Sequence, residues 1–143
     1  GVVGGKTVAE SYGFTAKTIT PAILLSSVAG KMDVTTKSYI AKGTPHFSTS
    51  ISDAQYDAVL RQVSEWNAKG GNSYNVNKRN CVHFSAEAMR RSGLRVVEDP
   101  KLIKKPRSFT RSIAALNAGR VTVIEKPSAA YVTTTPGLAG IGK

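Results

Sequence analysis

Residues 74–84 read Tyr-Asn-Val-Asn-Lys-Arg-Asn-Cys-Val-His-Phe, and this stretch decides how the rest of the chain is interpreted. Asn80 belongs to the residue types that favour helix N-caps, and Gly93 is a residue that commonly ends helices. The sequence therefore predicts a helix from Cys81 to about Arg91. In such a helix Cys81 lies in the first turn, where unpaired backbone N–H groups and the helix dipole favour a thiolate.

The position of Cys81 indicates a nucleophile. Lys78 and Arg79 stand just upstream and add positive potential, so we expect a lowered pKa for the thiol. The same backbone N–H groups are placed to stabilise an oxyanion during acyl transfer. The alternative is a buried structural cysteine, because free cysteines are among the most buried residue types.

A cysteine nucleophile usually works with a histidine that accepts and returns its proton, and the chain holds two histidines. His83 follows Cys81 by two residues on the predicted helix, so the two side chains project in different directions. We expect His83 to pack, to cap the helix or to shape the mouth of the site. His46 follows Pro45 and is the candidate base, with a solvated loop histidine as the alternative. Since no histidine follows His83, any further base must lie upstream.

Outward from this stretch, strands and helices mix without regular βαβ alternation, which predicts an α+β fold. The clearest further helix begins at a Ser52 and Gln55 capping box and ends at Gly70-Gly71. Two other helices are expected, a short one over 22–29 after Thr20-Pro21 and a last one over 108–116 capped by Ser108. Strands are expected over 47–51, 94–97 and 121–124.

The first residues predict a hairpin, because Gly4-Gly5 favours a tight turn before a β-prone run from Thr7 to Phe14. Gly-Gly-Lys6-Thr7 also resembles the end of a phosphate-binding loop, but that motif requires a helix directly after the threonine. The hairpin is uneven, since three residues precede the turn and about eight follow it. We therefore expect part of the first strand to lie upstream of Gly1.

Length and composition bound the chemistry. The 143 residues are 41% hydrophobic, which suffices for one packed domain, expected over 1–125 with a loosely held tail over 126–143. One cysteine excludes an intramolecular disulfide and, with two histidines, disfavours structural zinc, so we expect no metal and no cofactor. No membrane span or signal peptide is recognisable, which predicts a soluble chain, with secretion or delivery as an effector left open.

The net charge is +11, and residues 78–111 hold ten Lys or Arg against three Asp or Glu. This concentration predicts an anionic polymer, a lipid or an acidic protein as partner, and a solvated basic face is the alternative. Specific nucleic-acid recognition is disfavoured because few aromatic residues interleave with the charges. The candidate anion-binding residues are Lys101, Lys104, Lys105, Arg107 and Arg111.

Several of these stretches together resemble the C-terminal half of circularly permuted papain-like proteins, relatives of NlpC-type cell-wall peptidases and of lecithin:retinol acyltransferases. The matching features are Ile51–Tyr56, a helix ending in Trp66, Tyr74-Asn75, Asn80–Phe84 and Gly93-Leu94. The run Asn80–Phe84 is close to the Asn-Cys-Glu-His-Phe motif of the acyltransferases.

This resemblance implies a small antiparallel sheet with the nucleophile-bearing helix packed on it, and a thiol hydrolase or acyltransferase acting on an amide or ester of a cell-wall peptide, protein or lipid. It assigns the nucleophile to Cys81, with Asn80, His83 and Tyr74 in supporting positions. The resemblance also implies that the general base is a histidine on an earlier strand of the sheet. That histidine is expected upstream of Gly1, and if none is present there, His46 is the remaining candidate. Small basic proteins of this kind resemble bacterial toxin or effector domains, for which an acidic immunity protein is the expected partner. The competing hypothesis is a non-catalytic binding module that uses the basic face over 78–111.

Overall fold

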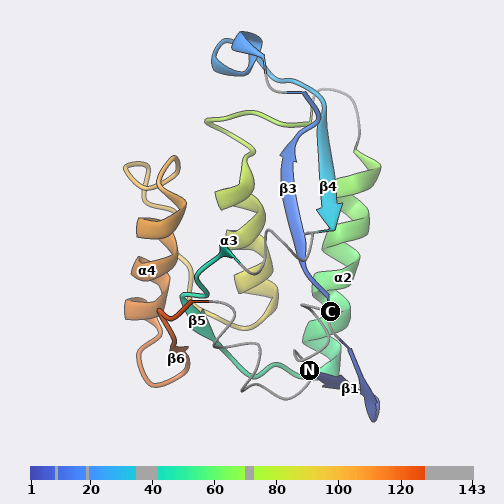
Figure 1. The fold of residues 1–143 in the computed structure, drawn as a ribbon, viewed down its shortest axis with the longest axis vertical. Coiled ribbons are helices and arrows are strands. Elements are labelled where there is room, and N and C mark those ends of the chain that lie inside the picture. Colours follow the sequence, from blue (N-terminus) through green and yellow to red (C-terminus); the bar gives the residue numbers. More distant parts are fainter. Residues whose placement is uncertain (9, 19, 35–41, 70–72, 128–143) are drawn as a thin grey trace.

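In the part of the chain that the structure describes, three α-helices combine with short antiparallel strands, which confirms the α+β class (Figure 1). The computed structural model describes residues 1–8, 10–18, 20–34, 42–69 and 73–127. In chain order the described elements are β1 (Val2–Val3), β2 (Lys6–Thr7), β3 (Tyr12–Ala16), the 3-10 helix η1 (Pro21–Leu24), β4 (Gly30–Val34), β5 (Phe47–Ser48), α2 (Asp53–Ala68), α3 (Cys81–Arg91), α4 (Pro106–Leu116) and β6 (Thr122–Val123).

Helix α2 starts where its capping box predicts. The Ser52 hydroxyl accepts a hydrogen bond from the Gln55 N–H at 3.1 Å, and the Gln55 side chain accepts one from the Ser52 N–H at 2.9 Å. These reciprocal bonds satisfy two N–H groups that the helix leaves unpaired. The glycines expected to end this helix lie outside the described residues.

Helix α3 has the predicted bounds and is held against α2 by Arg91. The Arg91 guanidinium donates to the Ala58 carbonyl at 2.8 Å and to the Glu65 carboxylate at 2.7 Å. Gly93 follows the helix with φ of +82°, a left-handed conformation that glycine adopts without strain. The predicted helix stop is therefore confirmed.

Helix α4 begins at Pro106, two residues before the expected start, so the expectation that Ser108 caps it is wrong. The N-cap position belongs to Lys105, which makes no side-chain capping bond. Proline suits the first helical position because its φ is fixed near the helical value and its missing N–H would have no partner there. The proline thus determines this helix start.

The main strand pair joins β3 to β4 in antiparallel register, with Phe14 opposite Met32. Strand β4 was not predicted, because Gly30 looks like a helix end and two charged residues interrupt the run. The helix expected over 22–29 shortens to η1, since Val28 instead pairs with Tyr74 through backbone bonds of 2.8 and 2.9 Å. Because this pairing requires an extended backbone at Val28, the helical segment ends before it and the chain continues into β4.

The hairpin at Gly4-Gly5 is confirmed, and both glycines have positive φ (+53° and +77°), as a tight hairpin turn demands. Lys6 and Thr7 lie in β2 and no helix follows them, which argues against a phosphate-binding loop. The β-prone run after the turn is divided between β2 and β3.

The strand expected over 94–97 is absent from the described residues, and an amide side chain replaces the missing pairing. The buried Asn117 side chain accepts from the Arg95 N–H at 2.9 Å and donates to the Arg95 carbonyl at 2.8 Å. The Asn117 amide thus pairs with both the N–H and the carbonyl of Arg95, as the backbone of a residue in a neighbouring strand would. The expected strands over 47–51 and 121–124 shorten to β5 and β6, which pair with each other.

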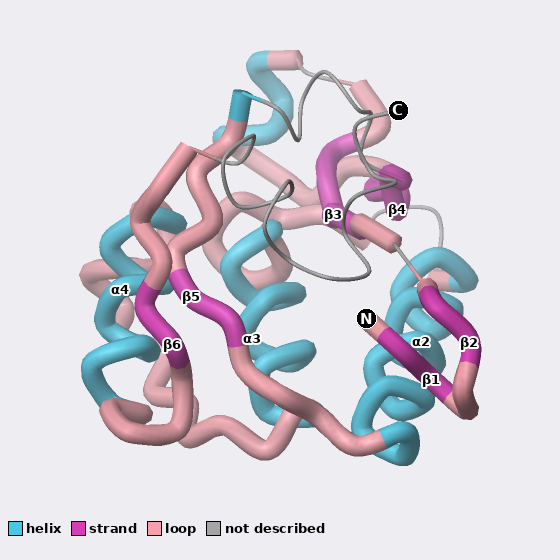
Figure 2. The backbone as a smooth tube through the Cα atoms, turned by 60° about the horizontal axis from the view of Figure 1, so that its bottom comes forward, coloured by secondary structure: helices cyan, strands magenta, loops and turns pink. Residues whose placement is uncertain are grey.

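Helix α3 lies between α2 and α4, while β3 and β4 lie beside α2 and the β5–β6 pair lies by α4 (Figure 1 and Figure 2). One core forms between α3 and α4 from Val82, Ala86, Phe109 and Ile113. A second, aromatic cluster joins β3 to α2 and α3, with the Phe14 and Trp66 ring centroids 4.9 Å apart and those of Trp66 and Phe84 5.3 Å apart. The start of α3 is therefore supported on both sides.

Candidate functional site

The start of α3 is organised by the buried side chain of Asn80, which is 4% exposed. Its Oδ1 accepts from the N–H groups of Val82 and His83 at 2.8 and 3.2 Å. Its Nδ2 donates to the carbonyls of Val76 and Ile103 at 2.8 and 2.9 Å. All the hydrogen-bonding groups of this amide are thus used, and they join α3 to the preceding loop and to the turn before α4.

His83 completes a capping box at the same helix start. Its Nδ1 accepts a hydrogen bond from the Asn80 N–H at 3.0 Å. Nδ1 also lies 3.0 Å from Asn80 Oδ1, but that oxygen already accepts from two N–H groups, and a backbone N–H can only donate. We therefore assign the ring proton of the neutral form to Nε2. Burial lowers the pKa of His83, and the charge of Glu98 opposes that change. Of the roles expected for His83, the structure therefore shows the capping role.

Cys81 is the first residue of α3, and its side chain is exposed. The expectation of a lowered thiol pKa is not met. The protein atoms around the sulfur hinder solvation of the thiolate and raise the pKa of Cys81, and the backbone N–H groups of Cys81 and Val82 offset that effect in part. The resting side chain is accordingly a thiol at neutral pH, which needs a base to become a nucleophile.

Within the described residues, one N–H group of the first helical turn makes no hydrogen bond to another residue, and it acts only on the sulfur of its own side chain. Asn80 occupies those of Val82 and His83 through its side chain and that of Phe84 through its carbonyl at 3.1 Å. The N–H of Cys81 itself donates to no other residue within the described part of the chain. An oxyanion formed on a group bonded to the sulfur would lie within reach of this donor.

Arg79 does not activate the thiol, because its guanidinium packs on aromatic rings. Its Cζ atom lies 3.7 Å from the ring centroid of Trp66 and 5.5 Å from that of Phe14. Burial lowers the pKa of Arg79, and its buried Nε and Nη2 atoms have no hydrogen-bond partner in the part of the chain that the structure describes. The sequence position of Arg79 predicted a positive charge beside the Cys81 sulfur. In the structure its guanidinium instead makes a cation–π contact with Trp66 on α2.

Tyr74 lies near Cys81, as the resemblance implies. Its backbone pairs with Val28, and its ring centroid is 5.6 Å from that of Phe14. Burial raises the pKa of the Tyr74 hydroxyl, and the charge of a Cys81 thiolate would raise it further. The second effect shows that the phenol and the thiol are within electrostatic reach of each other.

His46 lies just before β5 and interacts with a carboxylate that sequence reasoning missed. Its Nδ1 is 2.9 Å from Oε1 of Glu125. The same carboxylate accepts from Arg111, at 3.0 Å from Nε to Oε1 and at 3.2 Å from Nη2 to Oε2. Arg111 first, and then His46, lower the pKa of Glu125 to about 2. Glu125 is far from His46 in the sequence, and backbone pairing at the end of the β5–β6 pair brings the two residues together. No local sequence pattern predicts that contact.

No hydrogen bond joins Cys81 to either histidine among the residues described here. The structure therefore brings together Asn80, Cys81, His83 and Tyr74, and it holds His46 in a separate cluster with Glu125. Arg111 belongs to that second cluster. Glu125 therefore occupies the guanidinium group of Arg111. The other expected anion-binding residues form no ion pair with any described residue: Lys101, Lys104, Lys105 and Arg107.

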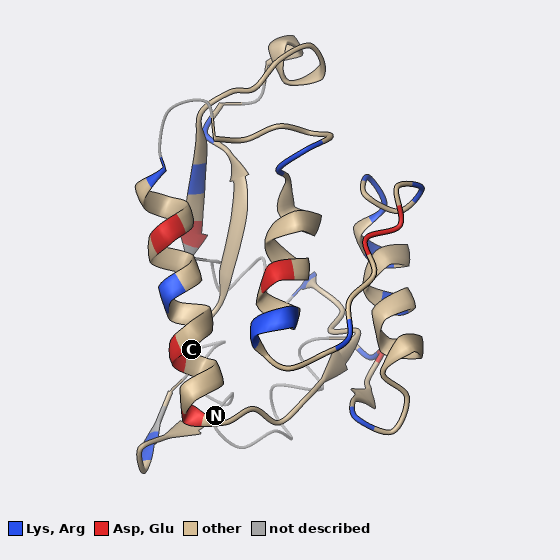
Figure 3. Ribbon diagram, turned by 180° about the vertical axis from the view of Figure 1, so that it is seen from behind, with Lys and Arg blue, Asp and Glu red and all other residues tan. Residues whose placement is uncertain are grey.

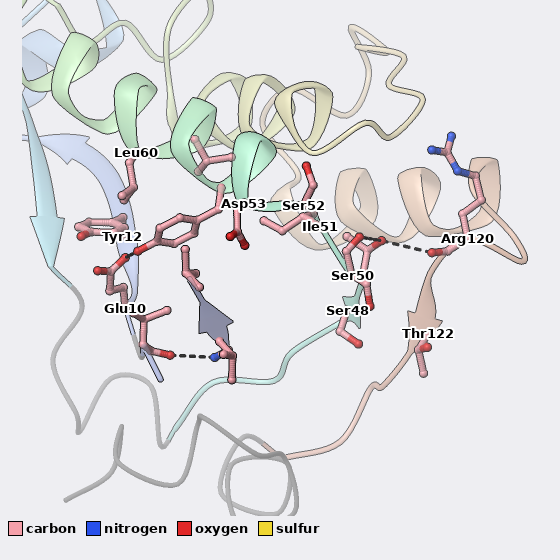
Figure 4. A pocket seen from close by; sticks show the side chains of 17 residues that line it. Glu10, Tyr12, Ser48, Ser50, Ile51, Ser52, Asp53, Leu60, Arg120 and Thr122 are labelled. Carbon is pink, nitrogen blue, oxygen red and sulfur yellow. Dashed lines mark hydrogen bonds between the residues drawn. The ribbon is translucent and has the colours of Figure 1, made fainter. Parts of the chain in front are cut away.

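A cavity of about 840 Å³ lies away from Cys81, between the β1–β2 hairpin, the start of α2 and β5 (Figure 4). The Tyr56 hydroxyl lines it and donates to Glu10 Oε2 at 2.7 Å, and this bond raises the pKa of Tyr56 to about 12. Because the described residues that line it include no histidine and no cysteine, we do not assign the nucleophilic chemistry to this cavity. An apolar groove of about 370 Å³ lies over α2 and α3 and includes Phe84 and Met89.

No protein family, curated protein or solved structure matches this chain. Within the described residues, no group of three His, Cys, Asp or Glu side chains is arranged to hold a metal ion. None of the described helices is both long and apolar enough to cross a bilayer.

Proposed function

We propose that this protein is a thiol hydrolase or acyltransferase that acts on an amide or ester bond through Cys81. The observation that carries the proposal is the start of α3, where the N–H of an exposed cysteine donates to no other residue that the structure describes, while Asn80 fixes the rest of the turn. Acyl transfer requires a nucleophile and a hydrogen-bond donor for the oxyanion, and Cys81 offers both, through its sulfur and its backbone N–H.

In the proposed reaction the Cys81 sulfur attacks the carbonyl carbon, and the Cys81 N–H stabilises the oxyanion that forms. Collapse of this intermediate expels the amine or alcohol and leaves a thioester on the sulfur. Water or another acyl acceptor then attacks the thioester and regenerates the thiol. Because burial raises the pKa of Cys81, a general base must remove the thiol proton in the first step.

The base has two candidates. His46 is oriented by Glu125 through Nδ1, which leaves Nε2 as the proton acceptor, as in the histidine–carboxylate pair of a catalytic triad. Because His46 lies in a cluster separate from Cys81 in this structure, it acts as the base only if the two clusters approach each other. The second candidate is a histidine upstream of Gly1, which the resemblance to permuted papain-like proteins implies. The coding sequence tests the second candidate. We expect a histidine within about a dozen residues before Gly1, a distance that one strand and its turn can span.

The finer assignments belong to the same proposal. The permuted papain-like fold is supported by the helix that starts with the nucleophile and by the small antiparallel strands beside it. A role as a bacterial toxin or effector, neutralised by an acidic immunity protein, is supported by the small size and by the net charge of +11. The bond cleaved is that of a cell-wall peptide, a protein or a lipid.

The experiment is hydrolysis of a panel of ester, peptide and lipid substrates by wild type, Cys81→Ala and Cys81→Ser. We expect both variants to lose activity on the accepted substrate while their unfolding curves match that of wild type. The serine variant is the closer control, because it keeps a polar group of similar size. Full activity in Cys81→Ala would exclude Cys81 as the nucleophile.

A non-catalytic binding module is the second candidate function, and two observations favour it. The pKa of Cys81 is raised, and four cationic side chains near the start of α4 have no ion-pair partner among the described residues. The pH dependence of iodoacetamide labelling separates the two functions. Labelling that rises with a histidine-like midpoint indicates a base-assisted nucleophile, whereas a midpoint above about 8.5 indicates an unassisted thiol.

A further inference from the structure

The tip of the loop between β3 and β4 exposes two adjacent leucines. Leu24 and Leu25 are 74% and 88% exposed, the highest values among the exposed large hydrophobic residues of the described chain. Backbone bonds from Ile23 N–H to the Thr20 carbonyl and from Leu25 N–H to the Ala22 carbonyl hold the turn at 3.1 Å each. Single exposed leucines are common on proteins, whereas apolar side chains that form a contiguous exposed patch mark interaction sites, and these two leucines are adjacent.

The basic turn, which we define as Lys101, Lys104, Lys105 and Arg107, provides positive charge at the same end of the molecule. All four side chains are exposed, and none forms an ion pair with a described residue. Asp99 is the nearest acidic residue in the sequence, and it accepts from the Lys101 backbone N–H at 2.9 Å. The basic turn therefore keeps its positive charges available for an external anion.

The apolar tip and the basic turn are joined through the segment that carries Cys81. Asn75 Nδ2 donates to Ser27 Oγ at 3.2 Å beside the tip, and Asn80 Nδ2 donates to the Ile103 carbonyl inside the basic turn. Figure 1 and Figure 3 show the η1 loop, the start of α3 and the turn before α4 toward one end of the molecule. Apolar and basic groups thus flank the candidate nucleophile.

We propose that this end of the molecule binds the surface of an anionic lipid bilayer, with Leu24 and Leu25 inserted at the acyl boundary and the basic turn on the headgroup phosphates. Apolar side chains together with Lys and Arg are the combination by which proteins bind such surfaces. An acidic protein with an apolar patch is the other partner that could contact both groups, and the variants described below distinguish it from a bilayer.

This inference does not rest on the proposed function, because neither the leucines nor the basic turn takes part in the chemistry at Cys81. The Cys81→Ala variant should therefore bind vesicles like wild type. If the protein is an acyltransferase or hydrolase, binding would bring Cys81 to the bilayer surface. Failure of vesicle binding and failure of catalysis remain separate results.

The test is co-sedimentation of the full chain with vesicles of phosphatidylcholine alone and of phosphatidylcholine mixed with phosphatidylglycerol. We expect binding to the mixed vesicles, weakened by salt because the headgroup charges are screened. The double variant Leu24→Ser/Leu25→Ser should bind at least about tenfold more weakly, since two apolar side chains no longer leave water. Its matched control is Val2→Ser/Val123→Ser, which changes two other exposed apolar residues and should bind like wild type.

The charge is tested in the same way by Lys104→Ala/Lys105→Ala, which we expect to bind about tenfold more weakly. Its control, Lys6→Ala/Arg61→Ala, removes the same net charge from elsewhere and should keep most of the affinity. Three results would overturn the proposal: no binding to the mixed vesicles at low salt, equal binding to both kinds of vesicle, or unchanged binding by the leucine variant. The last result, with charge dependence retained, would point to an acidic protein surface.

Discussion

The start of α3 and the corner formed by β5 and β6 each fix one histidine through Nδ1, but with opposite roles for that atom. At α3, His83 Nδ1 accepts from the Asn80 N–H. At the corner, His46 Nδ1 lies 2.9 Å from the Glu125 carboxylate, to which only a protonated nitrogen can donate. The neutral forms of the two rings therefore carry their proton on different nitrogens.

This difference separates a structural histidine from a chemically available one. Protonation of His83 at Nδ1 removes the acceptor on which the capping box depends, so its neutral form belongs to the fold. The bond from His46 to Glu125 uses Nδ1 alone, so Nε2 remains available to a further partner without disturbing the corner. The histidine closest in sequence to Cys81 is thus the one less suited to act as its base.

The strongest way to break the comparison is to remove the cap that organises the start of α3. We expect Asn80→Ala to lower the free energy of unfolding by about 2–4 kcal/mol, because it removes a helix cap and leaves two carbonyls without their donor. Urea unfolding measures this change. The control is Ser52→Ala in the exposed capping box of α2, expected to cost about 1 kcal/mol. Equal losses in the two variants would mean that Asn80 acts only as an ordinary cap.

The second prediction concerns pH and His83. Burial lowers its pKa below the ordinary value of about 6.5, so the unfolded chain binds more protons than the folded chain below that pH. The contribution of His83 to stability is therefore complete above pH 6.5 and is lost as the pH falls through the lowered pKa.

His83→Gln isolates this effect, because glutamine keeps the acceptor of the capping box, as Gln55 does in α2. Unfolding free energies of wild type and variant are compared at pH values on either side of 6.5. We expect the variant to lose less stability on acidification than wild type. An identical pH dependence would show that His83 is not the titrating group.

The smallest expected effect on stability is that of Glu125→Gln at the exposed corner. Glu125 has its pKa lowered to about 2, so its ion pairs stabilise the fold above about pH 4.5 and weaken as the pH falls toward 2. The sharper measurement is the nitrogen NMR spectrum of His46. We expect the variant to lose the preference for a proton on Nδ1, while the spectrum of His83 remains as in wild type.

The local signals in the sequence were sufficient for the two capped helices. Ser52 with Gln55 and Asn80 with Gly93 act within a few residues, so α2 and α3 begin where these residues predict. Pro106 is the same kind of local signal for α4, and it outweighs the capping preference of Ser108 two residues later. The position of Cys81 at a helix start follows directly from such local chemistry.

Contacts between residues that are distant in the sequence could not be predicted from such local signals. Strand β4 exists because β3 pairs with it, and residues 94–97 are held by the amide of Asn117 instead of by a strand. The same limit applies to the candidate site. Arg79 is adjacent to Cys81 in the sequence but packs on Trp66, and Glu125 meets His46 across 79 residues.

The central claim is that the start of α3 makes Cys81 a nucleophile for acyl transfer. The most direct measurement is the rate at which a p-nitrophenyl ester acylates Cys81, followed by mass spectrometry, in the folded chain and in the same chain unfolded in urea. We expect the folded chain to form the Cys81 thioester at least about tenfold faster, because one aligned N–H donor stabilises the oxyanion more strongly than water does. Acylation no faster in the folded chain than in the unfolded chain would contradict the claim.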